Sequence, residues 1–251
     1  MDFNFDQTID RSRFDSIKWH YFDPDILPMW VADMDFLSPP VVVQALVERA
    51  HHGIYGYGSE PAALREVIRE RLERLYAWKV PAAAIVFLPG VISGFNLCCS
   101  AFTQPGDSLV IQTPVYPPIL HAHQNHGLQS RQNSLVCGPD SRYDVDYDDF
   151  AAARREKPGM FLLCNPHNPV GIVFQRGELE RLAELCLASD YLICSDEIHG
   201  DLIFSESKHI PIASLDGAIA RRTITLMAPS KTFNIAGLDC SLAVIPDEDL
   251  R

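Results

Sequence analysis

The sequence has no long apolar run and is poor in basic residues. No stretch reaches the roughly 18 to 20 apolar residues that a membrane-spanning helix needs. The opening segment MDFNFDQTID is acidic, where a secretory signal peptide is basic and then apolar. Lys and Arg total 21 against 33 Asp and Glu, so the formal net charge is −12, which repels nucleic acids and anionic membranes. We therefore expect a cytoplasmic protein that binds neither.

No spacing typical of a disulfide framework or a metal site is present. The 7 cysteines are odd in number, form no C-x-x-C pair and lie mostly in apolar segments, which predicts buried thiols in a reducing compartment. None has the cationic, partly exposed surroundings of a catalytic cysteine. The cluster HAHQNH (His121, His123 and His126) lacks a Cys or acidic partner at the spacing of a known zinc motif. A solvated helix or turn is favoured there, and we expect no metal.

The chain also lacks internal repeats, low-complexity tracts and Gly/Ser linkers, so one continuous unit is expected behind an N-terminal arm. The arm spans residues 1–37 and is rich in aromatic and acidic residues. A large domain is expected over residues 38–251. It begins with Ser38 as the predicted N-cap of a helix over VVVQALVERAHHG that stops at Gly53. A glycine-rich loop, GIYGYGSE, and an amphipathic helix over PAALREVIRERLERLYAW follow.

Short apolar runs then alternate with helical stretches. The runs are AIVFL, SLVIQ, GMFLLC, YLICS and TITLM, and helices are predicted from about Ser93 and over GELERLAELCLAS. This alternation is typical of a mostly parallel sheet with helices on both faces, a three-layer α/β/α fold.

The segments directly after these runs hold the candidate functional residues, because ligands of open α/β sheets bind beyond the carboxyl ends of the strands. They read PGVISGFN, TPVY, NPHNPVG, DEIHGD and APSKTFNIAG. They bring a glycine turn that opens a helix, a tyrosine, an asparagine, an aspartate and a lysine toward one crevice. The residues concerned are Val91, Ile92, Tyr116, Asn168, Asp196 and Lys231.

This set of groups fits pyridoxal 5'-phosphate. Backbone N–H groups at the opening of the helix can hold a phosphate at the positive end of the helix dipole. Tyr116 can lie against a planar ring and Asn168 can donate to a phenolate oxygen. Asp196 can pair with a protonated ring nitrogen, which lets the ring delocalise a carbanion. Lys231 can form the Schiff base and then transfer a proton.

Each residue taken singly has a structural alternative. A lone lysine is usually a surface charge, NP-x-NP suits a pair of proline turns, and Asp196 with Glu197 suits a helix cap. Their joint order at successive strand ends favours the functional interpretation.

At these motifs the sequence resembles the fold type I pyridoxal-phosphate enzymes of aminotransferase class I/II. NPHNPVG, SDEIH and SKTFNIAGL stand in the order and spacing of that family's asparagine, aspartate and lysine motifs. More narrowly, IKWHYFDPDILPMWVADMDF, GIYGYG, TPVY and DEIH resemble the MalY/PatB group of cystathionine β-lyases, a branch of C–S lyases. The resemblance runs essentially from end to end and implies a pyridoxal-phosphate enzyme that forms a homodimer.

The resemblance also implies roles for individual residues. Lys231, Tyr57 and Tyr116 are the implied catalytic residues, and Tyr57 would reach the site of the neighbouring subunit. His199 replaces a tyrosine found in many aminotransferases, which favours the lyase branch. The implied cofactor-binding residues are Val91, Ile92, Tyr116, Asn168, Asp196, His199, Ser230 and Lys231.

The sequence departs from the family pattern in three ways. Ala228 stands where a phosphate-binding serine is common, so that Ser230 would compensate only in part. Asp239 stands where many aminotransferases have an arginine on the phosphate. Family members are also longer, so we expect a C-terminally truncated chain without most of the small domain and its arginine for the substrate carboxylate.

The expected reaction is α,β-elimination on cystathionine or a related L-cysteine conjugate, which yields a thiol, pyruvate and ammonia. One alternative is a class I/II aminotransferase that uses the same cofactor. Another is a non-catalytic truncated scaffold with a regulatory role.

Overall fold

The computed structural model describes residues 4–152 and 159–251. By its internal contacts the chain divides into two compact units. The arm unit comprises Met1–Glu60 with Pro229–Asp239, and the sheet unit comprises Pro61–Ala228 with Cys240–Arg251. The expected domain boundary between residues 37 and 38 stays a prediction.

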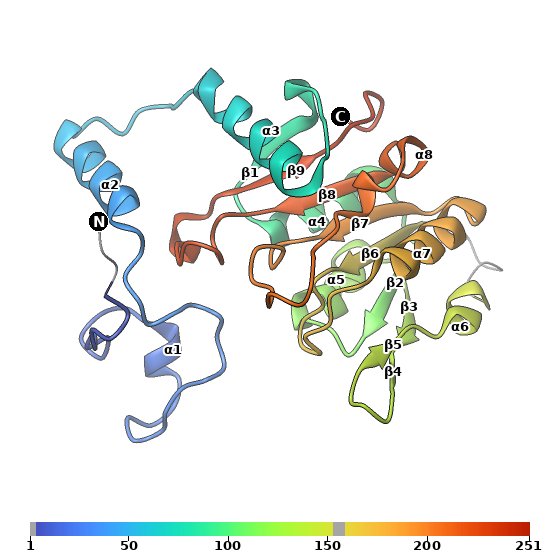
Figure 1. Cartoon of the computed structure of the whole chain (residues 1–251), viewed down its shortest axis with the longest axis horizontal. Coiled ribbons are helices and arrows are strands. Elements are labelled where there is room, and N and C mark those ends of the chain that lie inside the picture. The colour runs from blue at the N-terminus through green and yellow to red at the C-terminus, as the bar shows by residue number, and fades with distance from the viewer. Residues whose placement is uncertain (1–3, 153–158) are drawn as a thin grey trace. The chain divides into compact units, whose positions relative to one another are not determined.

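The sheet unit is built on a seven-stranded sheet in the order β1-β9-β8-β7-β6-β2-β3 (Figure 1). From β8 to β3 neighbouring strands run parallel, whereas β9 runs antiparallel to both β8 and β1. The mostly parallel α/β sheet predicted from the apolar runs is therefore confirmed. The strands are β1 (Ile85–Leu88), β2 (Ser108–Thr113), β3 (Gln129–Ser134), β6 (Met160–Cys164), β7 (Leu192–Asp196), β8 (Thr223–Met227) and β9 (Ser241–Val244), beside a separate hairpin of β4 (Val136–Cys137) and β5 (Tyr143–Asp144).

Helices cover both faces of the sheet, as expected (Figure 1). Successive residues of a strand point to opposite faces. Thus Leu192 and Cys194 of β7 pack in one buried cluster and Ile193 in another. The first cluster is closed by α4 (Val91–Phe102) and α5 (Pro117–His126), and the second by α6 (Tyr147–Ala152), α7 (Arg176–Ala188) and α8 (Gly217–Ala220). The other sheet-unit helices are α3 (Ala62–Tyr76), η1 (Ala82–Ala84) and η3 (Ile212–Ser214).

Several helix boundaries differ from the sequence predictions. α4 begins at Val91, earlier than expected, and HAHQNH lies within α5. In the arm unit α2 (Pro40–His52) ends at Gly53 as predicted, where a φ of 70° favours glycine. The prediction of Ser38 as N-cap is wrong, since Pro39 takes that position and no side chain caps α2.

The cysteines follow the expectation in part. Five are buried, and burial raises the pKa of the Cys99 thiol to about 12. Cys137 and Cys240 are exposed, against expectation, because Cys137 lies in the two-stranded hairpin and Cys240 lies just before β9, both outside the buried clusters. Within residues 4–152 and 159–251, no helix has the length and apolarity to cross a membrane.

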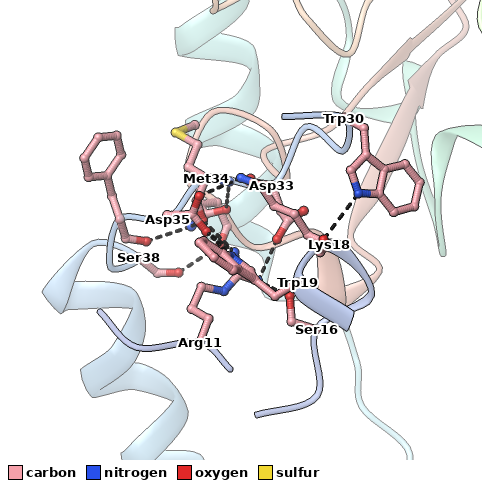
Figure 2. A network of polar contacts seen from close by, with 11 residues as sticks. Arg11, Ser16, Lys18, Trp19, Trp30, Asp33, Met34, Asp35 and Ser38 are labelled. Carbon is pink, nitrogen blue, oxygen red and sulfur yellow. Dashed lines mark hydrogen bonds and ion pairs between the residues drawn. The ribbon is translucent and has the colours of Figure 1, made fainter. Parts of the chain in front are cut away.

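The arm unit is held by polar contacts more than by an apolar core (Figure 2). It contains α1 (Ile17–His20), α2 and η4 (Ala236–Leu238), and α2 buries none of its residues. The Asp35 carboxylate accepts hydrogen bonds from Lys18 Nζ, Arg11 Nη1 and Trp19 Nε1 at 2.7, 2.7 and 2.9 Å. Partial burial by itself raises the pKa of Asp35, but these three donors lower it to about 2. Asp35 is therefore an ionised acceptor at neutral pH.

Gly159, the residue directly before β6, lies very close to the backbone of β2. Any Cβ at position 159 would collide with the Ser108 backbone carbonyl, which cannot move without disturbing β2. We predict that Gly159→Ala lowers the free energy of unfolding by about 1–3 kcal/mol, measured by urea denaturation. Gly177→Ala is the control, because nothing lies within 4 Å of that Cβ in α7. Gly177→Ala should leave the free energy of unfolding unchanged or raise it by up to about 1 kcal/mol. Equal free energies of unfolding for the two variants would contradict the close approach at Gly159.

Candidate functional site

Three of the predicted site residues lie at or just after the carboxyl ends of the neighbouring strands β2, β6 and β7. Tyr116 is the N-cap of α5, Asn168 lies in the loop after β6, and Asp196 is the last residue of β7. Tyr116 N–H donates to the Asn168 carbonyl at 3.0 Å, and Asn165 N–H donates to the Asp196 carbonyl at 2.9 Å. The sheet therefore brings these three segments together at one edge.

The loop that presents Asn168 is fixed by two buried polar residues that the sequence analysis did not assign. Asn165 Oδ1 accepts the Phe174 N–H at 3.2 Å, and its Nδ2 donates to the Ile210 carbonyl at 3.4 Å. His167 Nε2 lies 2.9 Å from the Pro114 carbonyl in the loop after β2. The signal was present in the sequence, since both are the other polar members of the motif NPHNP.

The charge of Asp196 acts on Tyr116. Asp196 is 5% exposed, and its Oδ1 accepts the Ile198 N–H at 3.1 Å. Burial first, and then the negative charge of Asp196, raises the pKa of Tyr116. The Tyr116 hydroxyl is therefore protonated at neutral pH and can donate a hydrogen bond.

Glu197, next to Asp196, holds the end of β7 through buried polar contacts. Its carboxylate accepts from Ser195 Oγ at 2.9 Å and from Ile212 N–H at 3.3 Å, and it lies 2.8 Å from His209 Nε2. Both Glu197 and His209 are buried. The helix-cap alternative for Asp196 and Glu197 is wrong, because a turn follows β7 instead of a helix. His199, half-buried, lies in this turn, where its carbonyl accepts the Leu202 N–H.

Val91 and Ile92 are the first two residues of α4, with Gly90 as N-cap and no side chain capping the first turn. Such a turn presents backbone N–H groups and the positive end of the helix dipole. A Cβ on Gly94 would lie 3.1 Å from Leu226 of β8, and Leu226 pairs in register with Asp196. The beginning of α4 is thus held on the strand next to the one that carries Asp196.

Tyr57, Ser230 and Lys231 belong to the arm unit. Tyr57 is fully exposed, Ser230 is 9% exposed and Lys231 is half-buried in the loop that begins after β8. Of the two residues that depart from the family pattern, Ala228 packs against the core of the sheet unit, and Asp239 is exposed with a left-handed φ of 48°.

The residues that the structure describes hold no group of three or more His, Cys, Asp or Glu side chains able to bind a metal ion. In particular, His123 Nδ1 bonds the Leu120 carbonyl and His126 Nε2 bonds Asn96, both within or beside α5.

Comparison with known proteins agrees with this architecture. Cystalysin from Treponema denticola, whose structure contains pyridoxal 5'-phosphate, superimposes with a TM-score of 0.94 at 31% identity, over 100% of this chain and 65% of its own. A pyridoxal-phosphate-bound C–S lyase from Staphylococcus hominis superimposes with a TM-score of 0.92 at 31% identity. The match covers 100% of this chain and 65% of that lyase. The sheet, its two helical layers and the residues at its carboxyl edge thus define the fold type I class of pyridoxal-phosphate-dependent proteins.

Within that class, the chain belongs to the aminotransferase class I and II family, whose model matches residues 24–250. It is 41% identical to cystathionine beta-lyase PatB of Bacillus subtilis over 250 residues, which are 97% of this chain and 64% of PatB. The family resemblance and the expectation that its members are longer are both confirmed.

The Glu197 network generates a stability prediction. Glu197→Ala leaves Ser195, His209 and the Ile212 N–H without their buried acceptor, so we expect a loss of about 3 kcal/mol or more in urea unfolding. Glu197→Gln keeps an acceptor for Ser195 and should lose clearly less. The network would be ruled out as an anchor if Glu197→Ala unfolded at the wild-type urea concentration.

Proposed function

We propose that this chain carries the cofactor-binding part of a pyridoxal-phosphate-dependent C–S β-lyase. The substrate would be cystathionine or a related L-cysteine conjugate, and the products a thiol, pyruvate and ammonia. The observation that carries this proposal is the meeting of Tyr116, Asn168 and Asp196 at one edge of the sheet. The names of PatB and of the Staphylococcus hominis C–S lyase support the reaction.

The residues of the sheet unit fit the cofactor by their chemistry. Asp196 supplies a nearly buried carboxylate for a protonated ring nitrogen, and Asn168 supplies an amide donor for the ring oxygen. The half-exposed ring of Tyr116 offers an aromatic face for stacking. The uncapped first turn of α4, at Val91 and Ile92, suits a phosphate.

When bound, pyridoxal phosphate supplies a carbonyl for amine attachment and an electron-accepting ring. The residues of the chain then handle protons. Lys231 Nζ removes the proton from the substrate α-carbon, and the Asp196 carboxylate holds the proton on the ring nitrogen. The protonated hydroxyl of Tyr116 orients the reacting groups or gives a proton to the leaving sulfur.

The remaining assignments concern the assembled protein. Ser230 would contact the phosphate and His199 would lie near the ring. A histidine at position 199, in place of the tyrosine of many aminotransferases, supports the lyase assignment. Tyr57, exposed in the arm unit, would reach the site of a partner subunit in a homodimer. The acidic composition fits a cytoplasmic enzyme. Since this chain spans 64% of PatB, all of these assignments are proposals about the whole protein.

Covalent attachment of the cofactor tests the proposal most directly. The purified protein should show the absorbance band of attached pyridoxal phosphate, and borohydride should abolish it. Lys231→Ala should lack the band because its side chain has no amine, and Lys208→Ala, at an exposed lysine outside the proposed site, should keep it. Asp196→Asn should still attach the cofactor covalently, but its turnover should fall by at least about a hundredfold. An effect of this size is typical when a group that holds or transfers a proton is removed. Attachment in Lys231→Ala equal to wild type would overturn the assignment.

A class I/II aminotransferase is the second candidate, favoured by the family to which the chain belongs. It would use the same residues but return the amino group to a 2-oxo acid. The lyase should release pyruvate and ammonia from cystathionine in equal amounts without any added 2-oxo acid. Strict dependence on a 2-oxo acid, with no ammonia released, would replace the lyase assignment by the aminotransferase.

A further inference from the structure

We propose that the N-terminal arm positions the loop that carries Lys231, with Asn234 as the positioning residue. The inference rests on the proposed function in one respect, because it takes Lys231 as the residue that binds the cofactor. The contacts themselves all lie within the arm unit.

Asn234 connects the arm to the lysine loop through its side chain and its backbone. Its Oδ1 accepts the Met34 N–H at 2.9 Å, and its Nδ2 donates to the carbonyls of Met34 and Phe36 at 3.0 and 2.8 Å. Its own carbonyl accepts from Ser38 Oγ at 2.9 Å. Asn234 therefore bonds three residues in the N-terminal part of the arm unit, Met34, Phe36 and Ser38, which lie 196 to 200 positions away in sequence.

The residue type at position 234 suits this contact. Its φ of 54° is left-handed, a conformation that asparagine tolerates better than most residues. The amide side chain also supplies both the acceptor and the two donors that a backbone segment requires. Leucine or alanine at this position would satisfy neither requirement.

The loop around Lys231 is closed on itself and joined to Asn234. Ile235 N–H donates to the Ser230 carbonyl at 2.9 Å, and Phe233 N–H donates to the Pro229 carbonyl at 3.0 Å. Lys231 lies inside both of these turns, three residues before Asn234. Fixing Asn234 therefore restricts the backbone from which the lysine side chain extends.

The arm segment that receives Asn234 is itself held by charge. Arg11 donates to Asp33 and Asp35, both at 2.7 Å, and Lys18 Nζ donates to Asp35 and to the Asp33 carbonyl at 2.7 and 2.9 Å (Figure 2). Lys18 is buried, which is rare for a lysine without an ionic partner. These contacts fix the residues on both sides of Met34, so the rigidity of the lysine loop depends on ion pairs near the N-terminus.

The test compares Asn234→Gly with Ser141→Gly. Glycine allows the left-handed backbone at position 234 and removes the three side-chain hydrogen bonds, but it also adds backbone freedom. Ser141 has a φ of 65° and lies exposed beside the hairpin in the sheet unit, so Ser141→Gly makes the same backbone change elsewhere. Asp35→Asn removes the charge that holds the arm segment. All four proteins are studied as the intact chain.

Two measurements are made on each protein. The first is amide hydrogen exchange in residues 229–239, which needs no cofactor. The second is the rate at which pyridoxal 5'-phosphate modifies Lys231, trapped with borohydride and read by peptide mass spectrometry. Modification of Lys208 in the same sample is the internal reference, because a general loss of structure would not slow Lys231 alone.

In Asn234→Gly we expect exchange in residues 229–239 to accelerate and Lys231 modification to slow by about tenfold, because a loose lysine spends less time in reactive geometry. Asp35→Asn should also accelerate exchange in residues 229–239 and slow Lys231 modification. Ser141→Gly should change neither the exchange nor the modification rate. Wild-type exchange and wild-type modification in Asn234→Gly would overturn the inference. If Lys231 of the wild type is not modified at all, the proposed function fails, and hydrogen exchange still decides whether the arm holds the loop.

Discussion

The burial of carboxylates at the end of β7 is the constraint on which the candidate site depends. Asp196 and Glu197 are consecutive in sequence, and both are removed from water. A buried carboxylate is costly unless it is hydrogen-bonded. Glu197 meets this requirement with Ser195, His209 and the Ile212 N–H, and this fixes the strand end from which Asp196 extends. A local hydrogen-bond network therefore satisfies the buried carboxylate of Glu197 and holds the end of the strand that carries Asp196, the residue proposed to bind the ring nitrogen.

The two units are stabilised by different interactions. The sheet unit has a continuous apolar core on both faces, with β6 and β7 buried along their whole length. The arm unit instead gathers charged and amide side chains around Asp33 and Asp35, and its helix α2 buries no residue. Ion pairs weaken as salt rises or as carboxylates are protonated, whereas apolar burial is neither screened by salt nor dependent on carboxylate ionisation. Residues proposed to bind the ring thus lie on an apolar scaffold, and the proposed lysine lies in a unit held by charge.

The sequence predicted those elements whose signal is local. Apolar runs predicted five strands of the sheet, and glycine predicted the end of α2 at Gly53. The strand β3, with the sequence QSRQNS, has no apolar run because it pairs only with β2 at one edge of the sheet, and it was missed. Ser38 was expected to cap α2, but its hydroxyl bonds Asn234, a distant partner that no local pattern reveals. Asn165 and His167 were overlooked for a related reason, since their hydrogen-bond partners lie in other loops.

The sequence by itself determined the chemistry: which polar residues follow which strands, and in what order. It could do so because strand periodicity and turn residues act over short stretches of chain, and because ligands of parallel sheets bind at one known edge. Only the tertiary structure decided that β9 enters the sheet antiparallel between β1 and β8, that Glu197 meets His209, and that Asn234 meets Met34. Those outcomes depend on pairing groups far apart in sequence, where each buried polar atom takes whichever partner the packing of the whole chain brings within reach.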